Sequence, residues 1–131
     1  RQRQMCIRDR LIKAFGAFPV TRGKGDTQVI DTSIEKLEKG RNLVIFPEGT
    51  RSKDGKVGKG KTGVALVAAV AQVPVVPVGI NFEGKLKFRK RVVVRFGKPI
   101  VPGEIGVTAT DPHSLRTIKN EIMKNITELV H

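Results

Sequence analysis

Two stretches of the chain carry apolar residues at the spacing of an amphipathic helix. The first helix is expected at residues 26–39, with Asp26 as its N-cap and Gly40 just beyond its last turn. Its apolar stripe is made of Val29, Ile30, Ile34 and Leu37. The second helix is expected to begin at Asp111 and Pro112, as N-cap and first helical residue. Its stripe is made of Leu115, Ile118, Ile122, Ile126 and Leu129.

Three short apolar runs between these helices predict strands. They lie at residues 42–46 (NLVIF), 75–81 (VVPVGIN) and 91–96 (RVVVRF). A helix of small residues, TGVALVAAVAQ at 62–72, separates the first two runs and is able to pack closely on a sheet. Helices that alternate with strands favour an α/β domain, with a mostly parallel sheet flanked by helices.

The length of the chain suits one folded domain. It has 131 residues, of which 39% are hydrophobic and 28% charged, so one core can form. We place the domain at residues 11–131. Residues 1–10 (RQRQMCIRDR) have no apolar period, and we expect them to be a non-native or disordered basic segment. The lone cysteine, Cys6, can form no internal disulfide, and no metal site or cofactor is expected.

The charge of the chain points to anionic partners. Its formal net charge is +13, which suits nucleic acid, an anionic lipid surface or a phosphorylated substrate. Because Trp and Tyr are absent, an RNA-binding module that stacks bases on aromatic side chains is disfavoured. The basic run KLKFRKR at 85–91, with Phe82, Leu86 and Phe88 interleaved, could contact an anionic membrane surface.

The segment FPEGTRS at 46–52 carries the clearest chemistry, because ligands bind at the carboxyl ends of strands in open α/β sheets. Its glycine allows backbone N–H groups to approach an anion, and its arginine offers a planar fork for two phosphate oxygens. Its glutamate can orient that arginine or hold a substrate hydroxyl. The predicted anion-binding residues are Glu48, Gly49, Thr50, Arg51 and Ser52.

This segment resembles the phosphate-binding block of the 1-acylglycerol-3-phosphate acyltransferase family, and three other segments match that family in order. GAFPVTRG at 16–23 resembles the block whose arginine, here Arg22, is assigned to the substrate phosphate. GKGKTGVALVA at 58–68 resembles the stretch in which a Lys-x-Gly opens a helix. We expect Lys61 there to be a solvated residue at the helix start. VPVVPVGI at 73–80 resembles the block near the acyl chain, which implies acyl-site lining by Val75, Val76, Pro77 and Val78.

The chain departs from that family at the catalytic motif. The family's H-x-x-x-x-D lies upstream of the block at 16–23, and here no histidine precedes that block. His113 is followed five positions later by Ile118, and His131 is the last residue. We therefore assign no catalytic residue and expect a domain that is truncated at its N-terminus and inactive alone.

The resemblance implies acyl transfer from acyl-CoA or acyl carrier protein to 1-acylglycerol-3-phosphate (lysophosphatidate), giving phosphatidate in phospholipid biosynthesis. It also implies a position on the cytoplasmic face of the membrane, either peripheral on an anionic surface or anchored through a missing N-terminal segment, with no nucleic acid as partner.

Two other functions compete with this one. GKVGKGKT, from Gly55 to Thr62, matches the phosphate-loop pattern of nucleotide-binding proteins, although no strand ends directly at Gly55. A basic module that binds nucleic acid or an anionic surface is the second alternative, and a steep salt dependence with any polyanion would favour it.

Overall fold

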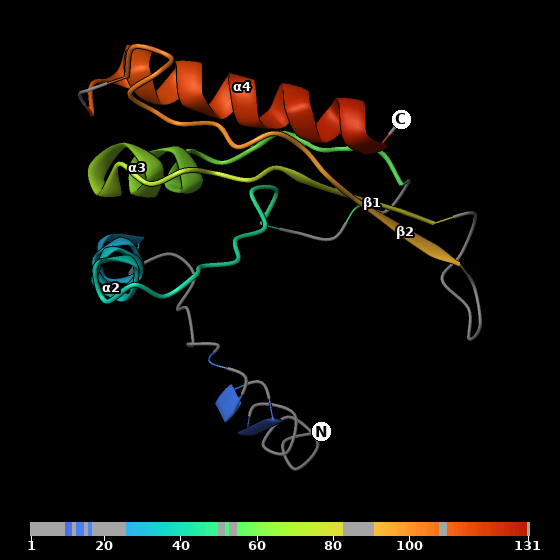
Figure 1. The fold of residues 1–131 in the computed structure, drawn as a ribbon, viewed down its shortest axis with the longest axis horizontal. Coiled ribbons are helices and arrows are strands. Elements are labelled where there is room, and N and C mark those ends of the chain that lie inside the picture. Colours follow the sequence, from blue (N-terminus) through green and yellow to red (C-terminus); the bar gives the residue numbers. More distant parts are fainter. Residues whose placement is uncertain are drawn as a thin grey trace.

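The computed structural model describes residues 10–11, 13–14, 16, 26–49, 52, 55–82, 91–107 and 110–130. Within these residues the order is α2 (Asp26–Glu38), α3 (Thr62–Ala71), β1 (Val78–Phe82), β2 (Val92–Phe96) and α4 (Pro112–Val130). Helix α3 packs against both α2 and α4, and the carboxyl-terminal part of α4 lies along the two strands (Figure 1). In this part of the chain, no helix has the length and apolarity that a membrane crossing requires.

The predicted C-terminal end of the first amphipathic helix and the predicted N-terminal end of the second are confirmed. After α2, Gly40 adopts a φ of +76°, and its N–H donates to the Leu37 carbonyl while the N–H of Arg41 donates to the Lys36 carbonyl. This is the Schellman arrangement, which satisfies the last carbonyls of a helix. Before α4, the Asp111 carboxylate accepts hydrogen bonds from the N–H and hydroxyl of Ser114, as an N-cap does.

The core lies where α3 crosses α4. The stripe of α4 supplies Ile118 and Ile122, which are fully or almost fully buried. They pack against the alanines of α3, whose small side chains allow the two helices to approach closely. Two residues that follow β2 complete the cluster, Ile100 and Val107. Burial of the α4 stripe against α3 therefore joins the two helices in one core.

The described sheet does not show the mostly parallel arrangement that we expected. The two strands of the described sheet pair antiparallel, from Val78 opposite Phe96 to Phe82 opposite Val92. Only residues 83–91 join the strands, and a parallel pair needs a crossover of a dozen or more residues. The predicted boundaries of β2 are confirmed to within one residue, whereas β1 begins later than expected. Upstream of β1, Val75 makes only an isolated bridge, to Ile100.

The predicted strand at 42–46 does not form, which is a correction to our prediction. These residues form no regular secondary structure, no described strand pairs with them, and Val44 is 81% exposed and Phe46 72% exposed. A strand needs a neighbour to take up its backbone hydrogen bonds, so an apolar run alone cannot produce one.

The two faces of the β1–β2 ribbon differ in what covers them. Gly79 lies under α4, where a Cβ atom would come within 2.6 Å of the Cβ of Leu129. On the same face, the Asn81 amide donates to the Val130 carbonyl and the Arg95 guanidinium to the Leu129 carbonyl. Side chains alternate along strands, so the opposite face carries the apolar ones. These are Val78, Ile80, Phe82, Val92, Val94 and Phe96, and all but Val78 are large exposed hydrophobics.

Candidate functional site

The predicted anion-binding loop is described in part. Glu48, Gly49 and Ser52 lie within the described residues, and Ser52 is exposed. Arg22, Thr50 and Arg51 lie outside them, so their roles stay predictions. The described part of the loop is nonetheless enough to show how it is held beside α3.

A tight turn carries the glycine of the loop. The Gly49 N–H donates to the Phe46 carbonyl at 3.1 Å, and Gly49 adopts a φ of +68°, a conformation that glycine reaches without steric cost. The Lys61 N–H donates to the Pro47 carbonyl at 2.8 Å. Residues 46–49 are therefore attached to the residue that immediately precedes α3.

Glu48 attaches the same loop to the segment that leads into α3. Its Oε2 accepts a hydrogen bond from the Gly58 N–H at 2.7 Å. We expected Glu48 to orient Arg51 or to hold a substrate hydroxyl, and the contact with Gly58 is a third role that the sequence pattern did not indicate. One of the two carboxylate oxygens of Glu48 is thus bound to the protein backbone.

The side chain of Lys61 lies on the turn. A Cβ atom at Gly49 would fall 2.9 Å from Lys61 Cε and 3.0 Å from Nζ, so a lysine can lie here only over a glycine. Lys61 is exposed, as expected, but it lies against a residue of the predicted site. The sequence could not reveal this contact, because it depends on how residues 50–60 return to the turn.

The four residues of the predicted acyl site differ in accessibility. Pro77 is buried, and Val75, whose backbone pairs with Ile100, packs against the core cluster. Val76 is among the exposed hydrophobics, and Val78 is half-buried in β1. If this segment lines an acyl chain, Val76 and Val78 are the residues that present apolar surface to it.

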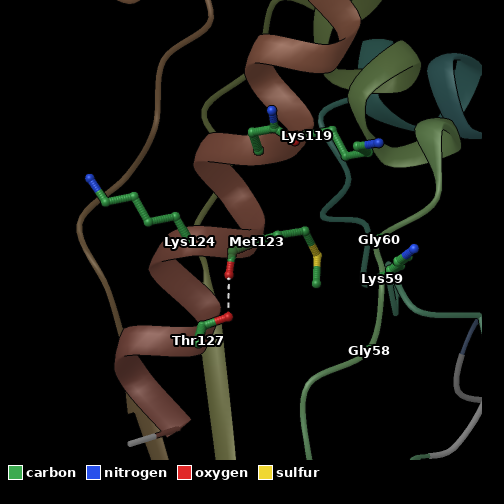
Figure 2. A pocket seen from close by; sticks show the side chains of 8 residues that line it. Gly58, Lys59, Gly60, Lys119, Met123, Lys124 and Thr127 are labelled. Carbon is green, nitrogen blue, oxygen red and sulfur yellow. Dashed lines mark hydrogen bonds between the residues drawn. The ribbon is translucent and has the colours of Figure 1, made fainter.

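An open hollow of about 450 Å³ lies between residues 58–60 and α4. Met123 points across it toward Gly60, whereas Lys124 points away from the 58–60 segment (Figure 2). The hollow is lined by Gly58, Lys59, Gly60, Lys119, Asn120, Met123, Lys124 and Thr127. None of the predicted site residues lines it. The hollow and the anion-binding loop thus both lie against the segment 58–60. No predicted anion-binding side chain lines the hollow.

The phosphate-loop alternative finds no support in the geometry. A phosphate loop binds its ligand through backbone N–H groups of the segment that here runs from Gly55 to Thr62. In this chain the Gly58 N–H is taken by Glu48 and the Lys61 N–H by the Pro47 carbonyl.

His113 lies in the first turn of α4 and is exposed, and its carbonyl accepts a hydrogen bond from the Thr117 hydroxyl. Next to it, the hydrogen bonds from the hydroxyl and then the N–H of Ser114 hold the pKa of Asp111 below its ordinary value. Among the described residues no three His, Cys, Asp or Glu side chains gather as a metal site would require. Among the described residues, the carboxylate near His113 is that of Asp111, and its hydrogen bonds are with Ser114 rather than with the imidazole.

Comparison with known proteins shows the family to which the chain belongs. Residues 3–81 match the Acyltransferase family model, which covers more than half of the chain. The chain therefore belongs to the acyltransferase family, and the resemblance to its 1-acylglycerol-3-phosphate acyltransferases is confirmed.

The relatives agree with this class. A chloroplastic 1-acyl-sn-glycerol-3-phosphate acyltransferase of Brassica napus is 41% identical over 74 residues, which are 55% of this chain and 22% of the relative. A lyso-ornithine lipid O-acyltransferase of Pseudomonas aeruginosa is 46% identical over 41 residues, which are 30% of this chain and 16% of the relative. This chain thus spans about a fifth of the length of these relatives.

A solved structure extends the similarity to the fold. The 1-acyl-sn-glycerophosphate acyltransferase of Thermotoga maritima superposes with a TM-score of 0.55 at 30% identity. The match covers 76% of this chain and 42% of that one. Helices α2, α3 and α4 and the described two-stranded sheet are consistent with an incomplete acyltransferase fold.

Proposed function

We propose that this chain is part of an enzyme that transfers a fatty acyl group from a thioester donor, acyl-CoA or acyl carrier protein, to 1-acylglycerol-3-phosphate. The product is phosphatidate. The observation that carries the proposal is the family match over residues 3–81, which contain the FPEGTRS loop. The Brassica relative, which acts on this acceptor by name, supports the choice of substrate.

In the proposed reaction a general base removes the proton from the free hydroxyl of the acceptor. The hydroxyl oxygen attacks the thioester carbonyl carbon, the C–S bond breaks, and the thiol leaves with a proton. Arg22 and Arg51 bind the acceptor phosphate in this proposal, and residues 48 and 49 shape the loop around it. The base of the family motif has no counterpart in this sequence.

The absent base gives the proposal a direct consequence for activity. Loss of a positioned general base costs roughly 10²–10⁴-fold in rate, so the 131-residue chain alone should show little or no acyl transfer. A thioester-release assay with acyl-CoA and lysophosphatidate measures this. Turnover at ordinary enzyme rates would mean that a base lies among the residues given structural roles here, and a His113→Ala variant would then show whether His113 is that base.

The proposed place of action is the cytoplasmic face of a membrane, where the chain would associate peripherally. Two properties support this: the proposed acceptor is a lysophospholipid, and a net charge of +13 favours an anionic lipid surface. Co-sedimentation with vesicles of anionic and of zwitterionic lipid tests it, with binding expected to the anionic vesicles alone.

Binding of the acceptor phosphate tests the site without requiring turnover. Arg51→Ala should weaken glycerol 3-phosphate binding by about 1.5–3 kcal/mol, measured by calorimetry, because a charge-assisted hydrogen bond is lost. Arg51→Lys should recover only part of this, since the planar fork is replaced by a point charge. Arg41→Ala serves as a control, because Arg41 is exposed and directly follows α2 and its Gly40 cap. Equal affinities for wild type and Arg51→Ala would remove the phosphate role.

The acceptor class has its own test, because the Pseudomonas relative acts by name on a lyso-ornithine lipid. In a chain that also contains the family's catalytic motif, lysophosphatidate should be acylated in preference to an acceptor without a phosphate. The preference should fall in Arg51→Ala. The opposite preference in the unaltered enzyme would place the chain with acyltransferases of other lysolipids.

A further inference from the structure

The open hollow between residues 58–60 and α4 gathers lysines from both of its walls. Lys59 belongs to the 58–60 segment, and Lys119 and Lys124 belong to α4. Lys119 lies close to the opposite wall, because a Cβ atom on Gly60 would come within 3.6 Å of Lys119 Cγ. None of the residues that line the hollow is acidic. A cleft lined by charges of one sign concentrates ions of the opposite sign, so this hollow favours an anionic ligand.

Carboxylates in the described part of the chain do not neutralise these lysines. None of the three forms an ion pair within the described residues. Glu121 also lies in α4, but it does not line the hollow, and its Oε1 accepts a hydrogen bond from the Asn125 amide at 3.1 Å. Lysines that share a hollow repel one another, and a bound anion would relieve that repulsion.

The size and the remaining lining of the hollow narrow the kind of anion. Its volume of about 450 Å³ lies within the range of roughly 300–1,000 Å³ that is typical of small-molecule sites. No aromatic side chain lines it, so it lacks the stacking surface that single-stranded nucleic acid uses. Asn120 adds an amide, and Met123 points across the hollow toward Gly60 (Figure 2). These properties suit a compact group of phosphates on a small molecule.

We propose that this hollow binds the phosphate groups of acyl-CoA, as the site of the thioester donor. The inference deepens the proposed function and rests on it. Acyl-CoA carries a pyrophosphate and a ribose 3′-phosphate, whose oxygens can accept charge-assisted hydrogen bonds from Lys59 and Lys119. The acyl thioester stands at the far end of the pantetheine arm, so the phosphates can bind at a distance from the reacting carbonyl.

The position of the hollow fits a second substrate. On the α4 side the segment 58–60 lines the hollow, while its Gly58 N–H donates to Glu48 of the predicted anion-binding loop. Acyl transfer requires the donor thioester and the acceptor hydroxyl to be held close together, so the sites for the two substrates must adjoin. The hollow meets this requirement without using any residue of the anion-binding loop.

Charge-neutralising variants of lysines inside and outside the hollow test the proposal. Lys59→Gln and Lys119→Gln each remove one charge from it, whereas Lys98→Gln removes one from an exposed lysine that does not line it. All three variants change the net charge by the same amount. Asn120→Ala alters the lining without changing the charge. Binding of CoA, dephospho-CoA and pantetheine is measured by NMR titration at constant ionic strength, with the Gly60 amide as reporter.

The wild type should bind CoA about 3- to 10-fold more tightly than dephospho-CoA, and pantetheine most weakly. Lys59→Gln and Lys119→Gln should each weaken CoA binding by about 3- to 10-fold, the scale of one charge-assisted contact near the surface. Asn120→Ala should weaken it by about 2- to 3-fold, and Lys98→Gln should stay within about 2-fold of wild type. The thermal unfolding midpoint of Lys59→Gln should equal that of the wild type, because Lys59 is exposed.

The failures of the two proposals are distinguishable, because glycerol 3-phosphate binding is measured in the same samples. If Arg51→Ala weakens that binding while Lys59→Gln and Lys119→Gln leave CoA binding unchanged, the role of the hollow is overturned and the proposed function stands. Losses of CoA binding that are as large in Lys98→Gln would reveal general attraction by the +13 chain and would also overturn it.

Two further outcomes separate donor from acceptor. Binding of acyl carrier protein without any binding of CoA would overturn the assignment of the hollow to acyl-CoA. If CoA binding depends on Lys59 and Lys119 but the wild type does not bind glycerol 3-phosphate, the proposed acceptor is wrong and the role of the hollow stands.

Discussion

The carboxylate of Glu48 accepts a hydrogen bond from the backbone N–H of Gly58, which attaches the Phe46–Gly49 turn to the segment before α3. Gly58 has little room for a side chain, since a Cβ atom there would lie 3.0 Å from Glu48 Oε2. Two residues later, a Cβ atom on Gly60 would lie only 2.6 Å from Met123 Sδ of α4. The segment from 58 to 60 is thus held between the anion-binding loop on one side and α4 on the other.

The Glu48 contact predicts a local change in amide exchange. Glu48→Ala should speed hydrogen exchange at the Gly58 N–H by about 2- to 10-fold, because one hydrogen bond is lost. Glu48→Gln should lie in between, since its amide oxygen can still accept. Exchange of the Gly55 amide, followed by NMR in the same samples, is the reference. Unchanged exchange at Gly58 in Glu48→Ala would show that the contact does not form in solution.

Gly49 and Gly55 form a matched pair for the second prediction. Both have a positive φ, of +68° and +75°, so alanine at either position should cost about 1–2 kcal/mol of stability. Only at Gly49 would the new Cβ meet Lys61, whereas nothing lies within 4 Å at Gly55. Gly49→Ala should therefore be the more destabilising change in urea unfolding.

A double variant separates the two contributions at Gly49. In a Lys61→Ala background the lysine no longer obstructs the turn, so the cost of Gly49→Ala should fall to that of Gly55→Ala. A cost that is the same in both backgrounds would contradict the contact between Lys61 and Gly49.

Gly79 provides a third prediction, on the packing of α4. A Cβ atom there would lie 2.6 Å from Leu129 Cβ and 2.9 Å from the Leu129 carbonyl carbon, and the helix backbone cannot yield as a flexible side chain can. Gly79→Ala should destabilise the fold by about 1–3 kcal/mol, as overpacking does. Gly63→Ala in α3 is the control: with nothing within 4 Å, it should stabilise by about 0.5–1 kcal/mol. Equal denaturation midpoints for the two variants would mean that α4 does not rest on Gly79.

The N-cap of α4 predicts a pH dependence of stability. Hydrogen bonds from Ser114 lower the pKa of Asp111 below its ordinary value of 3.8, so the ionised carboxylate favours the folded chain. This contribution is complete above pH 3.8 and is lost as the pH falls through the lower pKa of the folded state. The stability difference between wild type and Asp111→Asn, from urea unfolding, should be constant at higher pH and change only in this acid range. Ser114→Ala should reduce the change, and a difference that is independent of pH would contradict the cap.

Local signals in the sequence predicted the helices well. Asp111 with Pro112, and Gly40 after an apolar stripe, mark helix ends through backbone hydrogen bonds that involve only near neighbours, and both ends are confirmed. Gln72 was placed within a helix, but it adopts a left-handed conformation just beyond α3, which side-chain spacing alone does not reveal.

Features that depend on distant partners could not be predicted in the same way. The run at 42–46 has the composition of a strand, yet pairing depends on a second segment that the run itself does not specify. The antiparallel pairing of β1 with β2 could have been predicted from the short connection between them. For the site, the sequence indicated the loop and its charges, whereas the contacts of Gly49 with Lys61 and of Glu48 with Gly58 arise only when the chain returns to the turn.

The β1–β2 ribbon has a consequence for how the chain behaves at high concentration. Within the described residues each strand pairs only with the other, so no described strand occupies the outer edge of either one. The face opposite α4 is apolar, and Phe96 on it is 72% exposed. Open edges beside an apolar surface act as templates for intermolecular strand addition. Oligomers built through this ribbon should therefore enlarge the sheet while the packing of α3 on α4 is retained.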